Sequence, residues 1–433
     1  MGPRALGMGG AGVATAQGPL AAYWNPAALG RKVGNAYGLQ VPFGAHYGIT
    51  GSVVEGANDL RALRDKGVAT TQAEVDAAVA KLAQPGGGLR VDGGFAIASK
   101  IKDFSVFLNG FVFAGAVPFI DQPVTAAAVA AGTNNSKLIV KGASIGELGV
   151  GYGHELPFAP GLSAGGAIKL INATVGYADY FILRETNEEG DIVGKLKEGA
   201  RKSSNVGIDA GLLWDLDKSF DGVTLKPRVG LTGRNLNNPR FKTPTAASNA
   251  GLTSFKLNPQ VRLGFSLQPM NWWNLAADVD LTRNLTPVDN VASRQLGIGS
   301  EFNVFNRSWV NIPLRVGLSK NLAESSAGTM LSLGAGVHFL HVFIDASAAI
   351  SSKRIQTQSQ GKSEKTPREA ALGLQLSVLF GGAEPESPAR EWKRPPPADD
   401  QPVPTDKVRE AAEKAQKELD AEAAKKAPIY SPR

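Results

Sequence analysis

Hydrophobic and polar residues alternate with a period of two in many segments of the chain. Between residues 261 and 267, for example, every second residue is Val, Leu or Phe. This alternation predicts strands with one apolar face, and the segments have the length that a tilted strand needs to cross a lipid bilayer. Pro42 interrupts the first segment, which therefore forms one strand or two. The predicted strands cover residues 36–54, 89–99, 104–116, 142–155, 162–182, 203–215, 224–236, 256–268, 272–283, 294–304, 310–321, 328–340, 342–354 and 369–380.

The connections between these segments alternate between short and long. Those after the even-numbered strands are short, as at residues 102–103 and 340–341, whereas those after the odd-numbered strands are mostly longer. The first long connection contains an expected helix around residues 72–82. Bacterial outer-membrane barrels have short periplasmic turns, longer extracellular loops and an even number of strands, which places both chain ends in the periplasm. We therefore predict an all-β fold, a closed antiparallel transmembrane β-barrel of about 14 strands over residues 36–380.

Aromatic residues gather at the end of the predicted strands that faces the short turns. Amphipathic rings collect where a strand leaves the hydrocarbon of a bilayer, so this placement supports a membrane-spanning barrel. The last strand, residues 372–380, alternates up to a final Phe and is similar to the C-terminal signal by which such barrels are recognised for insertion. The aromatic residues at this end are Tyr152, Trp214, Trp272, Trp273, Phe302, Phe305, Trp309, Phe339 and Phe380.

Composition limits the function classes. The chain has 51 glycines and no cysteine, so neither a disulfide nor a cysteine-based metal site can form. The formal charge of +7 is spread over scattered basic residues that are mixed with acidic ones, which argues against nucleic acid as a partner. No run of about 18 apolar residues occurs, so no transmembrane helix is expected. We expect the protein among the lipids of the bacterial outer membrane; since no signal peptide is recognisable after Met1, we expect a mature form or a misplaced start.

If the apolar face of each strand meets lipid, the other face lines the lumen, and several charges on it lie symmetrically about short turns. Directly opposed unlike charges stabilise a hairpin by roughly 0.2–1 kcal/mol, so these pairs support the register. Filling of the lumen is the simplest role for them, and a role in transport or gating is the alternative. The expected pairs are Glu147 with Lys169, Asp209 with Arg228, Arg262 with Asp278, and Glu301 with Arg315.

The third strand differs from the others on its inward face. Phe107, Phe111 and Phe113 lie on that face, with Asn109 between them. An apolar stretch on a lumen wall is unusual, and it predicts either packing against a plug or a binding surface for a hydrophobic solute.

A glycine-rich stretch, residues 4–14, precedes the first strand and is followed at residues 22–29 by AYWNPAAL. The stretch also fits the dinucleotide-binding pattern G-x-G-x-x-G, but no strand precedes it, so that reading is rejected. Small residues let a chain pack closely inside a crowded lumen, and an Asn-Pro step favours a fixed turn.

This N-terminal segment resembles the start of the FadL superfamily, and more closely its TraF-like conjugal-transfer branch, where a glycine-rich stretch leads to a W/Y-N-P-A-x-L motif. It is also similar to TodX-type and PorV-like barrels. Later stretches that look similar are residues 229–236, 278–282 and 314–318. The resemblance therefore covers roughly residues 4–380.

The resemblance implies a fourteen-stranded barrel closed by an N-terminal hatch at residues 1–35, with Asn25, Pro26 and Ala27 as the hatch motif. FadL-like proteins move hydrophobic compounds through an opening in the barrel wall. The implied function is a channel for uptake or export of small, fatty-acid-like hydrophobic compounds. The alternative is a non-transporting component of a conjugal-transfer or secretion assembly, because the TraF-like branch is named for its genetic context and related barrels support secretion machinery.

The composition changes abruptly after Phe380. Residues 381–404 are rich in proline among charges and predict an extended linker, and residues 405–433 predict a charged, solvated helical tail. Residues 381–433 either contact a periplasmic protein or the cell wall, or form a passive tail. We expect neither a cofactor nor enzymatic activity, because none of His46, His154, His338 and His341 has metal-ligand or triad company in the sequence.

Overall fold

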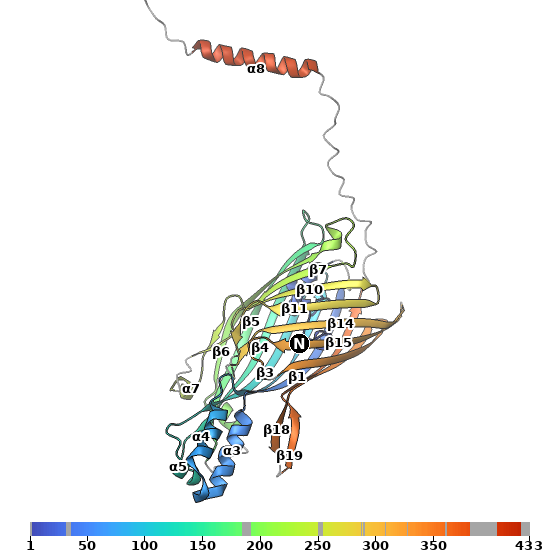
Figure 1. Cartoon of the computed structure of the whole chain (residues 1–433). Coiled ribbons are helices and arrows are strands. Elements are labelled where there is room, and N and C mark those ends of the chain that lie inside the picture. Colours follow the sequence, from blue (N-terminus) through green and yellow to red (C-terminus); the bar gives the residue numbers. More distant parts are fainter. Residues whose placement is uncertain are drawn as a thin grey trace, which may run out of the picture. The chain divides into compact units, whose positions relative to one another are not determined.

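The computed structural model describes residues 2–31, 36–183, 192–249, 254–286, 288, 291–307, 309–326, 328–359, 362–381 and 405–425. The chain divides into two compact units, Met1–Glu384 and Pro385–Arg433. The first unit is a closed β-barrel with an N-terminal segment inside it, and the described part of the second unit is a helix (Figure 1).

Fourteen antiparallel strands close the barrel, as the alternation predicts. Each strand pairs with the next, and β1 pairs with β20 to complete the ring. The segment around Pro42 is a single strand whose pairing with β2 is interrupted only at Val41 and Pro42, since proline has no N–H to donate. The barrel strands are β1 (Tyr37–Thr50), β2 (Gly88–Ile101), β3 (Phe104–Phe119), β4 (Lys137–Glu155), β5 (Leu162–Phe181), β6 (Arg201–Asp215), β7 (Arg228–Arg234), β10 (Gln260–Met270), β11 (Trp273–Asp280), β14 (Gln295–Asn306), β15 (Val310–Asn321), β16 (Thr329–Phe339), β17 (Val342–Ser351) and β20 (Glu369–Phe380).

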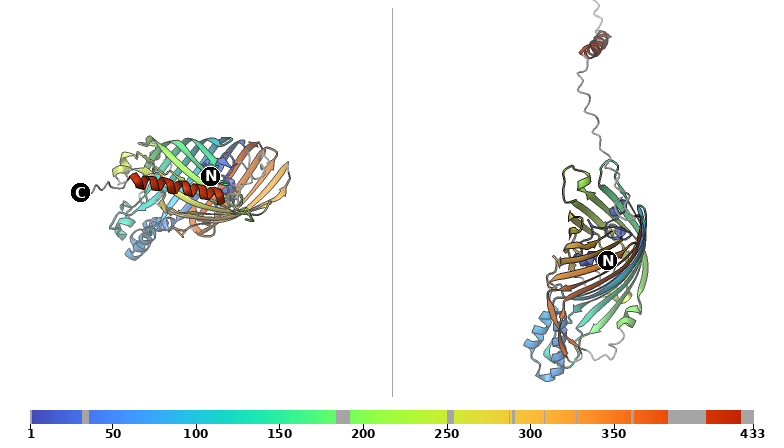
Figure 2. Two further views of the ribbon diagram at one scale, coloured as in Figure 1. Left: turned by 90° about the horizontal axis from the view of Figure 1, so that it is seen from above. Right: turned by 90° about the vertical axis from the view of Figure 1, so that its right-hand side faces the viewer.

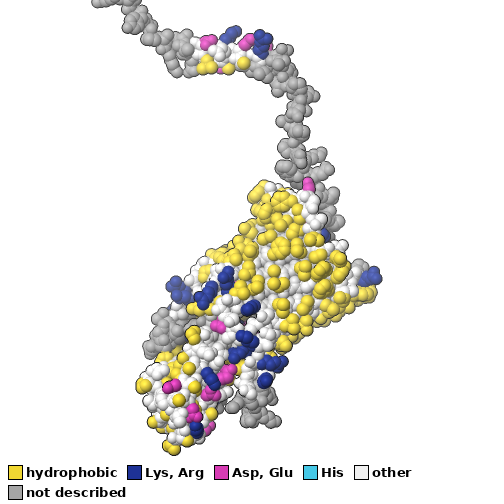
Figure 3. Space-filling model, viewed as in Figure 1, with side chains coloured by type: hydrophobic (Ala, Val, Ile, Leu, Met, Phe, Trp, Pro, Cys, Tyr) yellow, Lys and Arg dark blue, Asp and Glu magenta, His cyan; other side chains and the backbone are white. Residues whose placement is uncertain are grey.

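The outer face of the barrel is apolar and the inner face is polar or small. On β20, Leu372 and Leu374 are 63% and 60% exposed, whereas the alternate residues Gln375 and Ser377 are buried in the lumen. Figure 3 shows apolar side chains covering the visible outer wall, with charged side chains gathered towards one end. A closed barrel with such an outer band spans a lipid bilayer, because the strands satisfy their own backbone hydrogen bonds and the band faces hydrocarbon.

Short turns join the strands at one end of the barrel, which we term the turn side; the other end is the loop side. The long connections on the loop side hold small hairpins and helices (Figure 1). These elements are α3 (Val53–Lys66), η2 (Gly67–Ala69), α4 (Gln72–Leu82), α5 (Ala126–Ala130), α6 (Ile192–Lys197), α7 (Thr245–Asn249), β8 (Arg240–Phe241) with β9 (Phe255–Lys256), β12 (Asn284–Leu285) with β13 (Ala292–Ser293), and β18 (Arg354–Ser359) with β19 (Lys362–Pro367).

Two predictions about connections have different outcomes. The predicted helix is α4, which begins with a capping box in which Thr71 and Glu74 bond to each other's backbone. The turn after β6 is longer than predicted: it contains η4 (Leu216–Lys218), and β7 starts at Arg228 rather than at residue 224. Within the described residues, none of the helices combines the length and apolarity that crossing a membrane requires.

The N-terminal segment, residues 2–31, lies inside the ring of strands (Figure 2) and is termed the hatch. It contains α1 (Pro3–Gly7), α2 (Ala21–Trp24) and η1 (Pro26–Gly30). The remainder of the predicted hatch, residues 32–35, lies outside the described residues.

In the second unit, α8 (Thr405–Lys425) lies within the predicted helical tail. Of the predicted linker, residues 382–404 lie outside the described residues.

Candidate functional site

The predicted motif residues Asn25, Pro26 and Ala27 form a corner that fastens the hatch to the wall. Asn25 is fully buried, and its side-chain amide donates a hydrogen bond of 2.9 Å to the backbone carbonyl of Leu212 on β6. The side-chain oxygen of Asn25 accepts a 3.1 Å bond from the backbone N–H of Ala27. Pro26 occupies the first position of η1, where its missing N–H leaves no bond unmade. The motif therefore fixes the position of the hatch.

Glycines in the wall make room for this corner. They lie on three neighbouring strands, at Gly153 of β4, Gly165 of β5 and Gly211 of β6. A Cβ on Gly211 would lie 2.0 Å from the side-chain oxygen of Asn25, and a Cβ on Gly165 would lie 2.5 Å from the backbone N of Ala27. Side chains at these positions would therefore push η1 away from the wall.

A second set of glycines receives the other end of the hatch. Gly9 has a φ of 67°, a conformation that favours glycine, and lies against the inner faces of β14 and β15. A Cβ on Gly317 would lie 2.1 Å from the backbone N of Gly9, and one on Gly297 would lie 2.2 Å from its carbonyl oxygen. The hatch is thus in backbone contact with the wall, which explains part of the high glycine content.

Two carboxylates of the wall, Asp278 and Glu301, bind the glycine-rich part of the hatch directly. Asp278 on β11 accepts bonds of 2.8 and 2.9 Å from the backbone N–H groups of Gly12 and Val13. Glu301 on β14 accepts two 2.8 Å bonds from the guanidinium of Arg4. The two carboxylates of the wall thus accept hydrogen bonds from donors of the hatch.

Glu301 also pairs with Arg315, as the symmetry about their turn predicts. The two residues oppose each other across β14 and β15, and the guanidinium lies 2.7 Å from the carboxylate. Arg315 reaches a second carboxylate, Asp345 on β17, at 2.6 Å. Arg4, Glu301, Arg315 and Asp345 therefore form one continuous network, which we term the latch.

Glu147 and Lys169 are in contact, as predicted, but they do not lie directly opposite each other on β4 and β5. Lys169 opposes Gly149 rather than Glu147, and its ammonium lies 3.2 Å from Glu147 and 3.0 Å from Asp209. All three charged side chains are almost completely buried. Asn109 donates a 2.9 Å bond to Glu147, so the polar residue between the inward phenylalanines belongs to this buried cluster.

The prediction that Arg262 pairs with Asp278 is wrong. The turn lies between Met270 and Trp273, later than predicted, and the strands shift register once between Leu267 and Met270. Arg262 therefore opposes Asp280 and bonds to it at 2.6 Å. Asp278 is thereby left to bind the hatch.

The prediction that Asp209 pairs with Arg228 is also wrong. The long turn that contains η4 brings Arg228 opposite Asp215, and the two side chains form an ion pair. Asp215 also binds Arg31 at the end of the hatch, at 3.0 Å. Asp209 instead contacts Lys169 and accepts a 2.7 Å bond from the backbone N–H of Asn235.

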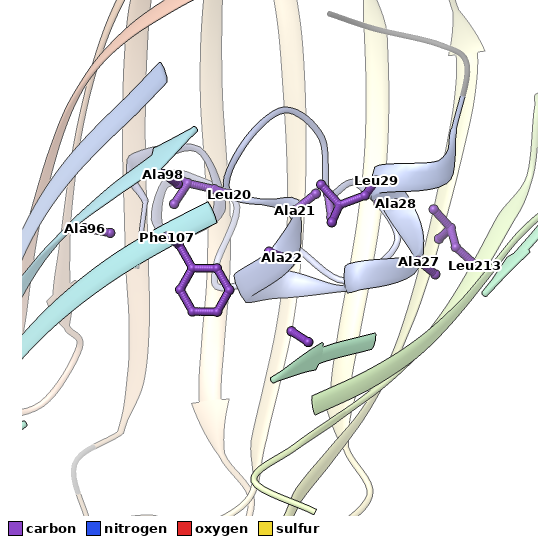
Figure 4. Close-up of a cluster of buried hydrophobic side chains, with 12 residues drawn as sticks. Leu20, Ala21, Ala22, Ala27, Ala28, Leu29, Ala96, Ala98, Phe107 and Leu213 are labelled. Carbon is purple, nitrogen blue, oxygen red and sulfur yellow. The ribbon is translucent and has the colours of Figure 1, made fainter. Parts of the chain in front are cut away.

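The inward phenylalanines of β3 extend from the hatch towards the loop side. Phe107 points into the hatch and packs with Leu20 and Ala22 (Figure 4). The ring of Phe111 lies 6.5 Å from that of Tyr23 and 5.9 Å from that of Phe113. The two alternatives for these residues are packing against a plug and binding of a solute. Phe107 packs against the hatch, whereas Phe111 and Phe113 lie farther towards the loop side.

Two loop hairpins fold back onto these upper rings. Phe241 of β8 and Phe255 of β9 are 3% and 4% exposed, and Val288 of the β12–β13 loop is 1% exposed. They pack in one cluster with Phe111 and Phe113 and with apolar residues of β4 and β5. We term Phe111, Phe113, Phe241 and Phe255 the apolar column. It lies on the loop side of the hatch, where Phe111 meets Tyr23.

The wall beside β3 is continuous. β3 pairs with β2 from Phe104 to Ala116 and with β4 from Phe104 to Phe119, without a register shift. The opening in the wall that the resemblance implies is therefore not present at this strand.

Several residues of the site were not predicted from the sequence. Arg4, Arg31, Asp215, Asp280 and Asp345 all form ion pairs in the lumen. Arg4 lies in the glycine-rich stretch. The three carboxylates lie on inward positions of their strands, so the alternation predicts that they face the lumen. The partners of the two hatch arginines are distant in sequence, and no local pattern identifies them.

The sequence matches the family model described as the F plasmid transfer operon protein TraF over residues 22–280. A search of curated proteins found no match. Among solved structures, the toluene transporter TbuX of Ralstonia pickettii is similar with a TM-score of 0.50 and 14% identity, over 88% of this chain and 98% of that chain. The toluene transporter TodX of P. putida has a TM-score of 0.48 and 13% identity, and a Pseudomonas aeruginosa FadL homologue has a TM-score of 0.43 and 13% identity. Each of these two matches covers 88% of this chain and 98% of the other chain. The likeness to TbuX shows a shared barrel fold.

Proposed function

This chain belongs to the family of F plasmid transfer operon TraF proteins, and we propose that it is a gated bacterial outer-membrane channel for small hydrophobic compounds. The exposed apolar outer wall supports insertion in a membrane, and the even strand number supports a turn side that faces the periplasm.

The observation that carries the proposal is the apolar column. The lumen of an outer-membrane barrel is ordinarily polar and wet, so buried phenylalanines there need a particular reason. Phe111 and Phe113 belong to the wall, whereas Phe241 and Phe255 belong to a hairpin in a loop-side connection. Displacement of that hairpin would expose the wall rings to a solute that enters from outside, and an apolar molecule would replace the contacts that the hairpin makes.

The hatch is suited to act as a gate. It is attached by separate polar contacts, at Asn25, at Asp278 and at the latch, rather than by strand pairing. Such contacts can break one at a time, so the hatch can open locally while the paired strands of the barrel stay intact. In this proposal the arrangement with the hatch inside the lumen, on the turn side of the column, is the closed state. TbuX, which shares the fold, is a toluene transporter, and toluene is therefore a suitable first probe.

The proposal is tested by uptake in cells. The full chain is expressed in a Gram-negative strain without its own FadL-type barrels, and the initial uptake of dilute radiolabelled toluene is measured. Lipopolysaccharide slows the free diffusion of apolar compounds, so a channel raises the rate. The variant Phe111→Ser with Phe113→Ser removes the wall rings of the column. Phe104→Ser is the matched control, because Phe104 lies on the same strand but faces outward near the membrane boundary.

We expect the chain to increase uptake several-fold, the control to retain the increase, and the double variant to lose most of it. Uptake that is unchanged by the wild-type chain, or equal in the double variant and the control, contradicts the proposal. Surface amounts of folded barrel are matched before rates are compared.

A second candidate function is a structural component of a transfer apparatus. The family description places its members in a transfer operon, and the second unit, Pro385–Arg433, carries a helix whose described side chains are solvent-exposed. Cross-linking in cells that contain the transfer genes compares the full chain with a chain truncated after Glu384. A partner captured only by the full chain supports this function, and identical cross-links for both chains count against a role of the tail.

A further inference from the structure

A pocket of 330 Å³ lies on the loop side of the barrel, near the place where the first and last strands of the ring meet. Three connections form it: the one between β1 and β2, the one between β15 and β16, and the one that holds the β18–β19 hairpin. Its volume falls within the range of about 300–1,000 Å³ that is usual for small-molecule sites. Neither the hatch nor the apolar column contributes to its described lining.

The pocket lies just beyond the apolar outer wall. Ile350 of β17 and Leu372 of β20 are exposed on that wall. Lys353 follows Ile350 by three residues and Arg368 precedes Leu372 by four, which is at most about 10–13 Å along the chain. The backbone N–H of Arg368 donates a 2.9 Å bond to the carbonyl of Lys353, so these two positions are neighbours. Figure 3 shows Lys and Arg side chains along the border between the apolar wall and the loop-side elements. This border is the level at which hydrocarbon gives way to lipid head groups.

Three cations line the pocket, namely Lys353, Arg354 and Arg368, and no carboxylate is among its described lining residues. Arg368 is bound by Glu55, which lies beside the pocket, at 3.3 Å. Lys353 and Arg354 instead donate to backbone carbonyls, at 3.1 and 3.4 Å. Within the described part of the chain, neither of these two cations is paired with a carboxylate. Their charge is therefore available to an anion.

Uncharged donors complete the pocket. Ser326 accepts a 3.1 Å bond from the backbone N–H of Gly51, which leaves its own hydroxyl proton to donate. Ser52 and Gln84 also line the pocket, and the side chain of Ser52 makes no capping bond to the helix that follows it. A second carboxylate beside the pocket, Glu324, accepts a 2.8 Å bond from the backbone N–H of Ser326 rather than from a cation. Three cations against the two neighbouring carboxylates leave one positive charge in excess.

A further cation lies in the same row of the barrel. Lys320 of β15 is exposed and lies on the same face of its strand as the outward-facing Leu318. It opposes Thr329 of β16, whose carbonyl accepts a 2.8 Å bond from the backbone N–H of Ser352. Lys320 is thus two strands away from the start of the pocket, a separation of about 10 Å. A single soluble anion in the pocket would not reach Lys320, whereas a lipid that carries two phosphates spans such a distance.

We infer that this pocket binds a phosphate group of lipopolysaccharide in the outer leaflet. Phosphate oxygens accept hydrogen bonds from ammonium, guanidinium and hydroxyl donors, which are the groups that the pocket presents. The acyl chains of the same lipid then lie along the exposed apolar residues of β17 and β20. The site involves no residue of the apolar column, and it shares with the proposed function only the placing of the loop side outside the cell.

Binding is measured by native mass spectrometry on the full chain, refolded from inclusion bodies into an amine-oxide detergent so that it carries no lipopolysaccharide. The probes are lipid A, which is the bisphosphorylated lipid anchor of lipopolysaccharide, and the same lipid after enzymatic removal of its phosphates. Inorganic phosphate is the soluble competitor. The test variant is Lys353→Gln with Arg354→Gln. Arg201→Gln with Lys202→Gln is the matched control, because it removes the same charge at the loop-side end of β6, outside the lining of the pocket.

We expect bisphosphorylated lipid A to bind the wild-type chain and the control equally, and to bind the test variant about tenfold or more weakly, since two cations near the phosphate are lost. The dephosphorylated lipid should bind the wild-type chain no better than the test variant. Circular dichroism and the heat-dependent gel mobility of the barrel show that the variants are folded. The inference is overturned if the dephosphorylated lipid binds the wild-type chain as tightly as lipid A does, or if the folded test variant binds lipid A as well as the control. Displacement of lipid A by an equal concentration of inorganic phosphate would overturn lipopolysaccharide as the source of the phosphate.

Discussion

The guanidinium of Arg4 in the hatch donates two hydrogen bonds of 2.8 Å to the carboxylate of Glu301 on β14, although 297 residues separate them. Glu301 is in turn bound by Arg315, so this carboxylate joins a side chain of the hatch to one of the wall. The hatch is therefore held by a specific, interruptible contact.

Replacement of Arg4 by Ala should loosen the hatch without unfolding the barrel. Glu301 keeps Arg315 as a partner, so the loss is smaller than for an isolated buried charge, and we expect the free energy of local hatch opening to fall by about 2 kcal/mol. Hydrogen exchange of the amides in residues 2–20 should become roughly 30-fold faster, since about 1.4 kcal/mol corresponds to tenfold. Arg64→Ala, on α3, is the control and should leave these rates unchanged.

Replacement of Gly317 by Ala should displace the hatch, because the added Cβ would lie 2.1 Å from the backbone N of Gly9. Gly146 on β4 offers a matched control, since a Cβ there would have no atom within 4 Å. Alanine is better than glycine in a strand by about 0.5–1 kcal/mol where space allows. We therefore expect opposite signs: thermal unfolding should shift down for Gly317→Ala, and should be unchanged or shift slightly up for Gly146→Ala. Equal shifts would mean that the hatch does not touch β15.

Asn25→Ala should destabilise the hatch by about 1–3 kcal/mol, because the buried carbonyl of Leu212 loses its donor. Asn25→Asp should be worse, since a carboxylate oxygen would replace the donating amide next to that carbonyl. Limited proteolysis of the hatch in detergent measures the order. Greater resistance of the Asp variant than of the Ala variant would show that Asn25 does not donate this bond.

Asp278 and Asp280 lie two residues apart on one strand but have different partners. Asp278 binds the N–H groups of Gly12 and Val13, whereas Asp280 binds Arg262. Asp278→Ala should accelerate exchange of those two amides at least tenfold, and Asp280→Ala should leave them protected, because the loss of Asp278 leaves two donors without an acceptor. Similar protection in both variants would mean that Asp278 does not bind the hatch amides.

The barrel was predictable from the sequence because alternation repeats in every strand, so that an error at one boundary does not alter the whole. The helix at residues 72–82 was also predictable, since Thr71 and Glu74 give it a local start signal. By contrast, α3 begins with two valines only two residues after β1, and β-branched residues there favour a strand that continues to residue 54.

Register and long-range contacts could not be predicted in the same way. Symmetry about a turn located Arg315 opposite Glu301, where the strands pair regularly up to a shift near the turn. It failed for Arg262, because the turn lies between Met270 and Trp273, later than predicted, so that Arg262 opposes Asp280 and not Asp278. The contact of Arg4 with Glu301 depends on where the hatch lies inside the closed barrel, and alternation contains no information about that position.

The most direct test of a hatch that gates a hydrophobic channel is to lock it reversibly. The chain has no native cysteine, so Ala22→Cys with Gly151→Cys introduces one possible disulfide, between the hatch and β4, where the Cβ atoms would lie 3.0 Å apart. That is near the about 3.5–4.5 Å of natural disulfides. Gly151→Cys with Ala167→Cys is the control, because it joins two positions of the wall whose Cβ atoms would lie 3.7 Å apart.

Toluene uptake by cells that carry each variant is measured with the disulfide formed and after its reduction. We expect the lock between hatch and wall to abolish the increase in uptake, reduction to restore it, and the wall-to-wall control to be active in both states. Uptake that is the same with the hatch locked and released would contradict it.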